Sequence, residues 1–250
     1  MALPAGINAT WLKTNYGGGL QFVDKAGVPL PTSMFDIQLC AAQEWVEIEL
    51  GIVIGPRDVV ADRYDVTKLT PPYFQTPVRY RPVREATGAR FRWGNNPQSQ
   101  PIPVEWLMVR QKRLIEIVCD LRTPIQPVSV LYAYNWPWPW IYNNQRAPGF
   151  LELDYAAGFD GVQLPVPPGI ANAIGLKAIM LALVALSNSL FPPGTTNISR
   201  SQDGLSQSRG TTNSANKVLL GAMIDEYQRQ LDMQMLTLRA EWKAAQFRAF

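Results

Sequence analysis

The clearest hydrophobic pattern in the chain lies at its carboxyl end. Apolar residues recur there at steps of four, three, four, four, three and four, which is the spacing of one continuous helix face. The pattern repeats every eleven residues, a period that favours a nearly straight helix. We therefore predict a long helix that starts near Ser214 and runs toward Phe250. Its apolar face consists of Leu220, Ile224, Tyr227, Leu231, Met235, Leu238 and Trp242.

Two further segments carry helical patterns. Between residues 33 and 50 one face is apolar, Ser33 and Asp36 are spaced like a capping box, and Gly51 follows as a helix-ending glycine, so we predict a helix there. Residues 167–189 are nearly all apolar and bracketed by prolines, which predicts a second helix. Polar residues interrupt this segment, and we expect a helix buried in a soluble bundle rather than a membrane span.

The middle of the chain, residues 52–166, has a different character. Of the 21 prolines, 16 lie between Pro56 and Pro168, and this density excludes long helices. Short β-prone runs bounded by Pro, Gly or Asn predict a compact antiparallel β unit. We expect the Trp-Pro run at 136–140 to form a stiff surface loop. The strand candidates are 52–54, 78–84, 90–93, 104–109, 114–121, 128–134 and 150–155.

These patterns predict an α+β fold. We expect a bundle of three main helices, the last long and protruding, with an inserted antiparallel β-rich unit. The polar stretch 191–213 is predicted to be a long flexible loop. The expected domains are an N-terminal arm at 1–32, a helical core at 33–51 plus 160–250, and the inserted β domain at 52–159.

Composition limits the chemistry that this chain can perform. The sequence contains no histidine, which removes Ser-His and Cys-His nucleophile pairs and histidine metal ligands. Its two cysteines, Cys40 and Cys119, form no CxxC pattern and are expected to be buried free thiols. Hydrophobic residues make up 47% and the net charge is +3, as in a globular protein. We expect a non-enzymatic protein without cofactor or metal, and the first residues do not resemble a secretion signal.

Arginines alternate with apolar residues in the middle segment. A hairpin turning near Thr87-Gly88 would place them on one sheet face. Three interpretations stay open: a solvated face, a face that meets an acidic partner, and a face that binds DNA phosphates without reading bases. The third would make the chain a nucleic-acid-binding module. The arginines concerned are Arg79, Arg81, Arg84, Arg90 and Arg92.

Acidic residues offer one further alternative, an aspartate-dependent metal enzyme. It requires at least two of the aspartates to converge on one cation. We favour solvated strand ends or ion pairs with neighbouring arginines. The residues concerned are Asp58, Asp62, Asp65, Asp154 and Asp160.

Several short motifs carry a resemblance to a known family. Residues 151–159 read as a strand that breaks at an Ala-Gly-aromatic turn, and residues 164–170 read as a proline-flanked helix entry. The apolar helix, the loop Asp203-Gly204-Leu205-Ser206-Gln207-Ser208 and the long last helix follow. In this order the chain resembles the head-tail connector (adaptor) proteins of tailed bacteriophages. The resemblance covers about residues 33–51 and 150–250, and leaves the β unit unassigned.

The resemblance implies a virion protein of the phage neck, made in the host cytoplasm. Its expected partners are further copies in a closed ring of twelve, the portal protein above, a downstream neck or tail-completion protein below, and packaged DNA in the central channel; no membrane is expected. Arg200 and Arg209 are expected at the channel or a subunit contact. Deletion of the last ten residues is expected to abolish portal binding. The portal-docking residues would be Met235, Leu238, Arg239, Trp242, Lys243, Phe247, Arg248 and Phe250.

Overall fold

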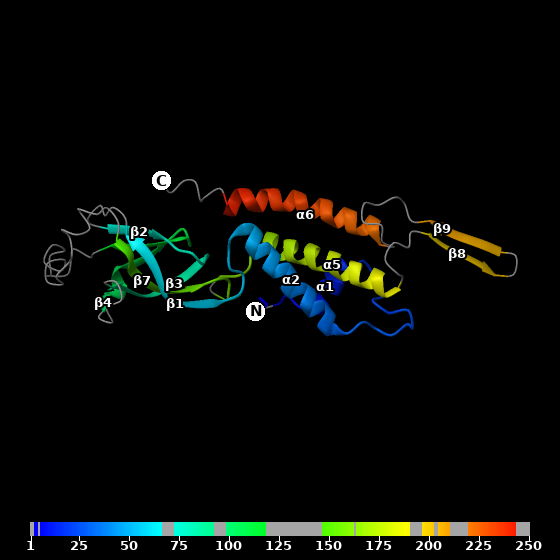
Figure 1. The fold of residues 1–250 in the computed structure, drawn as a ribbon, viewed down its shortest axis with the longest axis horizontal. Coiled ribbons are helices and arrows are strands. Elements are labelled where there is room, and N and C mark those ends of the chain that lie inside the picture. The colour runs from blue at the N-terminus through cyan, green and yellow to red at the C-terminus, as the bar shows by residue number, and fades with distance from the viewer. Residues whose placement is uncertain are drawn as a thin grey trace. The chain divides into compact units, whose positions relative to one another are not determined.

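A computed structural model shows an α+β fold, as predicted, which divides into two compact units (Figure 1). Residues 1–51 and 166–250 form the helical unit, and residues 52–165 form the β unit. The structure describes residues 3–4, 6–66, 73–92, 99–118, 147–162, 164–190, 197–202, 205–210 and 220–243. The elements are α1 (Ala9–Tyr16), α2 (Thr32–Leu50), β1 (Arg57–Val66), β2 (Tyr73–Pro77), β3 (Val83–Arg92), β4 (Ser99–Ile102), η1 (Val104–Trp106), β5 (Leu107–Arg110), β6 (Leu114–Val118), β7 (Ala147–Ala157), α5 (Pro168–Leu190), β8 (Asn197–Gln202), β9 (Leu205–Gly210) and α6 (Gly221–Trp242).

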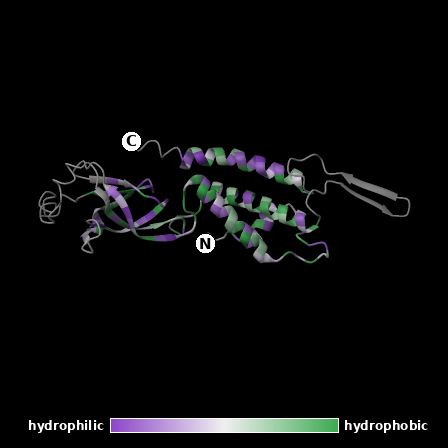
Figure 2. Ribbon diagram, viewed as in Figure 1, coloured by the Kyte–Doolittle hydropathy of each residue, from purple (hydrophilic) through white to green (hydrophobic). Residues whose placement is uncertain are grey.

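The centre of the helical unit is α5, which packs against α1, α2 and α6. Its residues are apolar on nearly every side, and in Figure 2 it is mostly coloured as hydrophobic. Its length and hydropathy would suit a membrane span, but 61% of its most apolar window is buried within the chain. A helix that is apolar all round is typical of the core of a helical layer, as we expected for this segment.

The two ends of α2 illustrate one wrong and one confirmed prediction. The helix begins at Thr32 after Pro31, and no described side chain caps its first N–H groups, so the capping box at Ser33 and Asp36 is wrong. Pro31 precedes the helix with φ −63°, and its carbonyl accepts a hydrogen bond from the Met34 N–H at 3.1 Å. At the other end Gly51 has φ 64° and ψ 41°, and its N–H donates to the Glu47 carbonyl. This is the predicted glycine cap.

A short helix lies in the segment that we expected to be an arm. In α1 the Asn8 side chain accepts a hydrogen bond from the Trp11 N–H at 2.8 Å, which caps the helix start. Leu12 is fully buried. The helix has only eight residues, too few for its periodicity to stand out, and packing against α2 and α5 accounts for its stability.

The β unit consists of two antiparallel sheets with strand orders β1-β7-β3-β4 and β2-β6-β5. Both sheets contribute side chains to one hydrophobic cluster, which includes Leu153, Tyr155, Ile115 and Ile117. The chain enters and leaves this unit side by side, because the Phe159 N–H donates to the Ile54 carbonyl at 3.0 Å.

The predicted hairpin at Thr87-Gly88 is wrong. Residues 83–92 form the single strand β3, which pairs with β7 and β4. Gly88 lies at a register shift opposite Asp154, and a Cβ there would lie 3.2 Å from the Asp154 carboxylate. The glycine therefore permits a bulge beside an acidic side chain rather than a turn.

The predicted flexible loop at 191–213 is also wrong where the structure describes it. β8 and β9 pair antiparallel from Asn197↔Gly210 to Gln202↔Leu205. The intervening Asp203-Gly204 is a strong hairpin dipeptide in the sequence, and the polar composition on both sides hid it. The Trp-Pro run, the strand candidate at 128–134, Cys119 and Ser214 lie outside the described residues.

Candidate functional site

The arginines of the β unit face carboxylates on neighbouring strands. Glu152 on β7 has a side chain only 2% exposed, and it lies among three guanidinium groups. Its distances are 2.6 Å to Arg90, 3.4 Å to Arg92 and 3.5 Å to Arg63. Burial raises the pKa of Glu152, but the hydrogen bonds and charges of Arg90 and Arg92 outweigh it, so the pKa lies below its ordinary value.

The remaining arginines of the predicted basic face either lie near carboxylates of the same chain or are buried. Arg84 lies 3.0 Å from Asp160 and 3.9 Å from Asp58. Arg79 is 3.8 Å from Asp62, and Arg81 is buried. Most of the positive charge of this surface is thus balanced within the chain. Its proposed use on an acidic partner or on DNA stays a prediction, and the geometry favours a structural role for Arg84 and Arg90.

A polar network links β1 and β7 at the centre of the β unit. The Asp62 carboxylate accepts hydrogen bonds from the hydroxyls of Tyr64 at 2.5 Å and Tyr155 at 2.9 Å. Burial, followed by the hydrogen bond to Asp62, raises the pKa of Tyr64 above its ordinary value. Burial raises the pKa of Tyr155 to about 12. Both hydroxyls therefore stay protonated at neutral pH and hold Asp62 as donors.

The aspartates of the metal-enzyme alternative serve different partners. Asp65 accepts from the Gly149 N–H at 2.8 Å, and Asp154 accepts from the Ala61 N–H at 2.6 Å. Asp160 holds the backbone N–H groups of Val162 and Leu164. Within the described part of the chain, no group of three or more His, Cys, Asp or Glu residues is placed to hold a metal ion.

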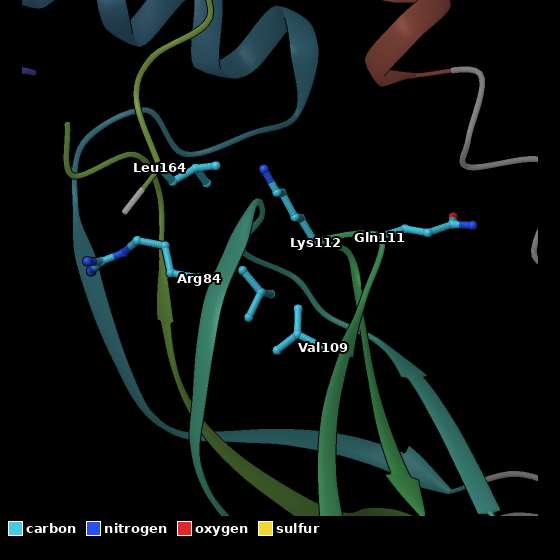
Figure 3. A pocket seen from close by; sticks show the side chains of 6 residues that line it. Arg84, Val109, Gln111, Lys112 and Leu164 are labelled. Atoms are coloured by element: carbon cyan, nitrogen blue, oxygen red, sulfur yellow. The ribbon is translucent and has the colours of Figure 1, made fainter. Parts of the chain in front are cut away.

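One pocket of about 390 Å³ lies in the β unit (Figure 3). The figure shows Lys112 directed toward Leu164, while Arg84 points away from the cavity. Its described lining residues carry no carboxylate, thiol or hydroxyl, and Lys112 contributes the one side-chain amine among them. The lining residues are Val83, Arg84, Val109, Gln111, Lys112 and Leu164.

The predicted portal-docking residues separate into three groups. Met235, Leu238 and Trp242 are buried within the chain, at 2%, 5% and 8% exposure, and form the inward face of α6. As docking anchors they would have to leave this core. Arg239 and Lys243 are exposed, and Arg239 pairs with Glu49 at 2.6 Å. The third group, Phe247, Arg248 and Phe250, lies outside the described residues.

Polar contacts fix α6 to the rest of the helical unit. The Tyr16 hydroxyl donates to Asn172 Oδ1 at 2.7 Å, the Asn172 amide donates to Gln234, and the Gln234 amide donates to the Gly169 carbonyl at 2.9 Å. The Tyr227 hydroxyl donates to the Tyr16 carbonyl at 2.8 Å. This chain of bonds joins α1, α5 and α6 and sets the register of α6, which sequence patterns did not indicate.

Apolar side chains also lie on the outward faces of α2 and α6. Ile37 and Ile48 on α2 are 65% and 71% exposed, and Met233 and Leu236 on α6 are 65% and 67% exposed. In both helices these residues lie opposite the buried face. The sequence patterns predicted only the stronger apolar face of each helix, which is buried, and did not predict these outward apolar residues. A second apolar spacing within each helix was the signal that could have found them.

Arg200 and Arg209 lie on the hairpin of β8 and β9. In its register Arg200 pairs with Gln207, and Arg209 pairs with Ile198. The two arginines thus belong to opposite strands of one short ribbon rather than to an irregular loop. Their expected place at a channel or subunit contact stays a prediction.

These features define an α+β protein in which a helical unit carries an inserted antiparallel β unit. No protein-family model and no curated protein matches the chain. Among solved structures, it is similar to a chain of the "virion of native gene transfer agent (GTA) particle", with 17% identity, a TM-score of 0.43, and coverage of 74% of this chain and 81% of the other. It is also similar to a chain of the "neck of empty GTA particle computed with C6 symmetry", with 18% identity, a TM-score of 0.40, and coverage of 71% and 79%.

Proposed function

We propose that this chain is a structural, non-enzymatic virion protein, a neck adaptor that forms a ring beneath the portal of a tailed phage or phage-like particle. It joins head to tail and surrounds the DNA channel. The observation that carries the proposal is the junction at residues 155–159. The motif on which the family resemblance was stated lies here, at a backbone position that only glycine can occupy.

At this junction β7 ends, and the chain makes a turn within the β unit. Gly158 has φ +85°, and a Cβ there would collide with the backbone carbonyl of Gly55. Phe159 then enters the core at 2% exposure. Only glycine meets both the positive φ and the close approach, so the Tyr-Ala-Ala-Gly-Phe pattern has a physical reason. The motif glycine on which the resemblance was stated thus has a structural role in this chain.

Docking to the portal is assigned to the last seven residues, 244–250, with Lys243 at their base. Aromatic residues at interface centres often cost about 2 kcal/mol or more when truncated. Removal of the last ten residues would also delete Trp242, which is buried and stabilises the packing of α6. The informative deletion therefore ends the chain after Lys243.

The test measures binding of the full chain and of the chain ending at Lys243 to the portal protein of the same particle. We expect the deletion to abolish co-sedimentation with the portal and to leave the melting temperature unchanged. A Phe247→Ala/Phe250→Ala variant should reproduce the loss, and Gln246→Ala is the matched control. Equal portal binding by the full and shortened chains would reject the docking assignment.

A further inference from the structure

We propose that the outward faces of α2 and α6 bind each other between neighbouring copies of this chain, head to tail. The α2 outer stripe is Ile37, Ala41, Glu44 and Ile48, and the α6 outer stripe is Arg229, Met233, Leu236 and Ala240. This inference rests on the proposed ring function and specifies the two surfaces that would build the ring.

Both stripes are exposed over their whole length. All eight residues are exposed, and the four large apolar side chains among them have exposed fractions of 65% to 71%. Single exposed apolar residues are ordinary, but aligned sets on two helices of one unit are typical of interaction surfaces.

The two stripes have the same geometry. Each follows steps of four, three and four residues, which is the spacing of a helix–helix seam. Each therefore extends about 16 Å along its helix at 1.5 Å per residue. Two seams of equal period and length can pack along each other with a small crossing angle.

Side-chain size also matches between the stripes. With the helices parallel, Ala41 lies opposite Met233 and Ala240 lies opposite Ile48. With the helices antiparallel, Ala41 lies opposite Leu236 and Ala240 lies opposite Ile37. In either direction each alanine meets a large residue, which is how facing helices fill the space between them.

Charge favours pairing of α2 with α6 over pairing of α2 with itself. α2 carries Asp36, Glu44, Glu47 and Glu49 and no basic residue, so two α2 helices would repel each other. α6 carries Arg229 and Arg239 beside four acidic residues, so it is less negative than α2, which carries four acidic residues and no basic one. The α6 outer stripe contains Arg229, whose side chain is 70% exposed and lies 3.0 Å from Glu226, and the stripe continues to the exposed Lys243. With the helices antiparallel, Arg229 lies opposite Ile48, one helical turn from Glu44, which has the opposite charge.

The positions of the stripes favour a head-to-tail contact. α5 packs against both α2 and α6, and each stripe faces away from the buried side of its own helix. α2 and α6 also contact each other, where Arg239 pairs with Glu49 at 2.6 Å, and the two stripes are two different surfaces of one unit. A contact between two different surfaces of identical chains is heterologous, and such contacts close into rings when the rotation between copies permits.

Two double variants test the proposal by complementation. Variant A is Ile37→Asp/Ile48→Asp and lacks the α2 stripe; variant B is Met233→Asp/Leu236→Asp and lacks the α6 stripe. We expect the unaltered chain to self-associate at high concentration, and A and B to be monomers by sedimentation velocity. Mixed in equal amounts, A and B should form a dimer and no larger species, because only one intact pair of stripes remains.

The controls separate a lost contact from a lost fold. Val60 and Val162 are 73% and 88% exposed in the β unit, and Val60→Asp/Val162→Asp should assemble as the unaltered chain does. Unchanged melting temperatures of A and B establish that both are folded. If melting changes, the milder Ile48→Ser and Leu236→Ser variants take their place.

Several outcomes would overturn the inference. They are assembly of A or B alone, a mixture that stays monomeric, and an unaltered chain that is monomeric even at millimolar concentration. Loss of portal binding in A and B without any self-association would assign the stripes to the portal instead. If complementation succeeds and the chain fails to bind a portal, the inference stands and the proposed function falls.

Discussion

Arg90 donates a hydrogen bond from its Nε to Oε1 of Glu152 at 2.6 Å, between the paired strands β3 and β7. The acceptor is almost fully buried, whereas the donor is 31% exposed. A residue expected on a partner-binding face thus stabilises the sheet by neutralising a carboxylate that burial would otherwise destabilise.

Substitution of this arginine should therefore reduce stability. We expect Arg90→Ala to lower the free energy of unfolding by about 2 kcal/mol, because a charge-assisted hydrogen bond to a buried group is lost while Arg63 and Arg92 remain. Urea unfolding of the full chain measures the effect. Arg79→Ala is the matched control, since its side chain is 63% exposed and 3.8 Å from Asp62, and it should cost less than about 1 kcal/mol. Equal losses would contradict the structural role of Arg90.

A second prediction concerns Gly175, which lies beneath the ring of Tyr16. A Cβ at this position would overlap the ring, so we expect Gly175→Ala to lower the free energy of unfolding by about 2 kcal/mol, despite the higher helix propensity of alanine. Thermal melting followed by circular dichroism measures it. In Gly169→Ala the new Cβ meets the flexible end of Leu238 at 3.3 Å, and the change should be within about 1 kcal/mol. A Tyr16→Ala background should remove the cost at Gly175.

A third prediction concerns alkaline pH. Burial raises the pKa of Tyr16 and of Tyr155 to about 12, from 10.0 for a free tyrosine. Their contribution is fully present below pH 10 and is lost as pH rises toward about 12, because the unfolded chain ionises these hydroxyls first. We expect the free energy of unfolding to fall between pH 10 and 12. The decline should be shallower in Tyr16→Phe than in the unaltered chain, and identical slopes would refute the assignment.

A fourth prediction concerns acid pH. Asp160 accepts N–H groups from Leu164 at 2.8 Å and Val162 at 3.0 Å, and its ion pair with Arg84 adds to these. The Leu164 N–H, followed by the other contacts, lowers the pKa of Asp160 to about 2, from 3.8. Its contribution is present above about pH 4 and is lost as pH falls toward 2. Asp160→Asn should flatten the acid limb of a stability–pH curve, and an unchanged limb would count against this role.

The sequence was sufficient for the fold class and for the helices with strong periodicity. α2 and α5 lie within one residue of their predicted bounds, because a continuous apolar face or an apolar run bracketed by prolines leaves few alternatives. α1 was too short to show a period, and Asp203-Gly204 was overlooked as a hairpin signal among polar residues. At Thr87-Gly88 a strand bulge and a turn share the same residues, so local sequence cannot separate them.

The candidate site was less predictable for a different reason. Periodicity shows that one face of a helix is apolar, but it does not show whether the chain itself or a partner covers that face. Met235, Leu238 and Trp242 were predicted to contact a portal, and within the chain they are covered by the helical unit. The opposite stripe, with Met233 and Leu236, is the one left uncovered. Only tertiary packing distinguishes the two.

The hydrogen bond between Phe159 and Ile54 brings the two ends of the β unit together. A domain whose two ends lie close together can be inserted or exchanged with little change in the surrounding backbone, because that backbone has to bridge only a short gap. Residues 51 and 166 are therefore natural graft points, where a different domain with similarly close termini could replace the β unit without rerouting the helices.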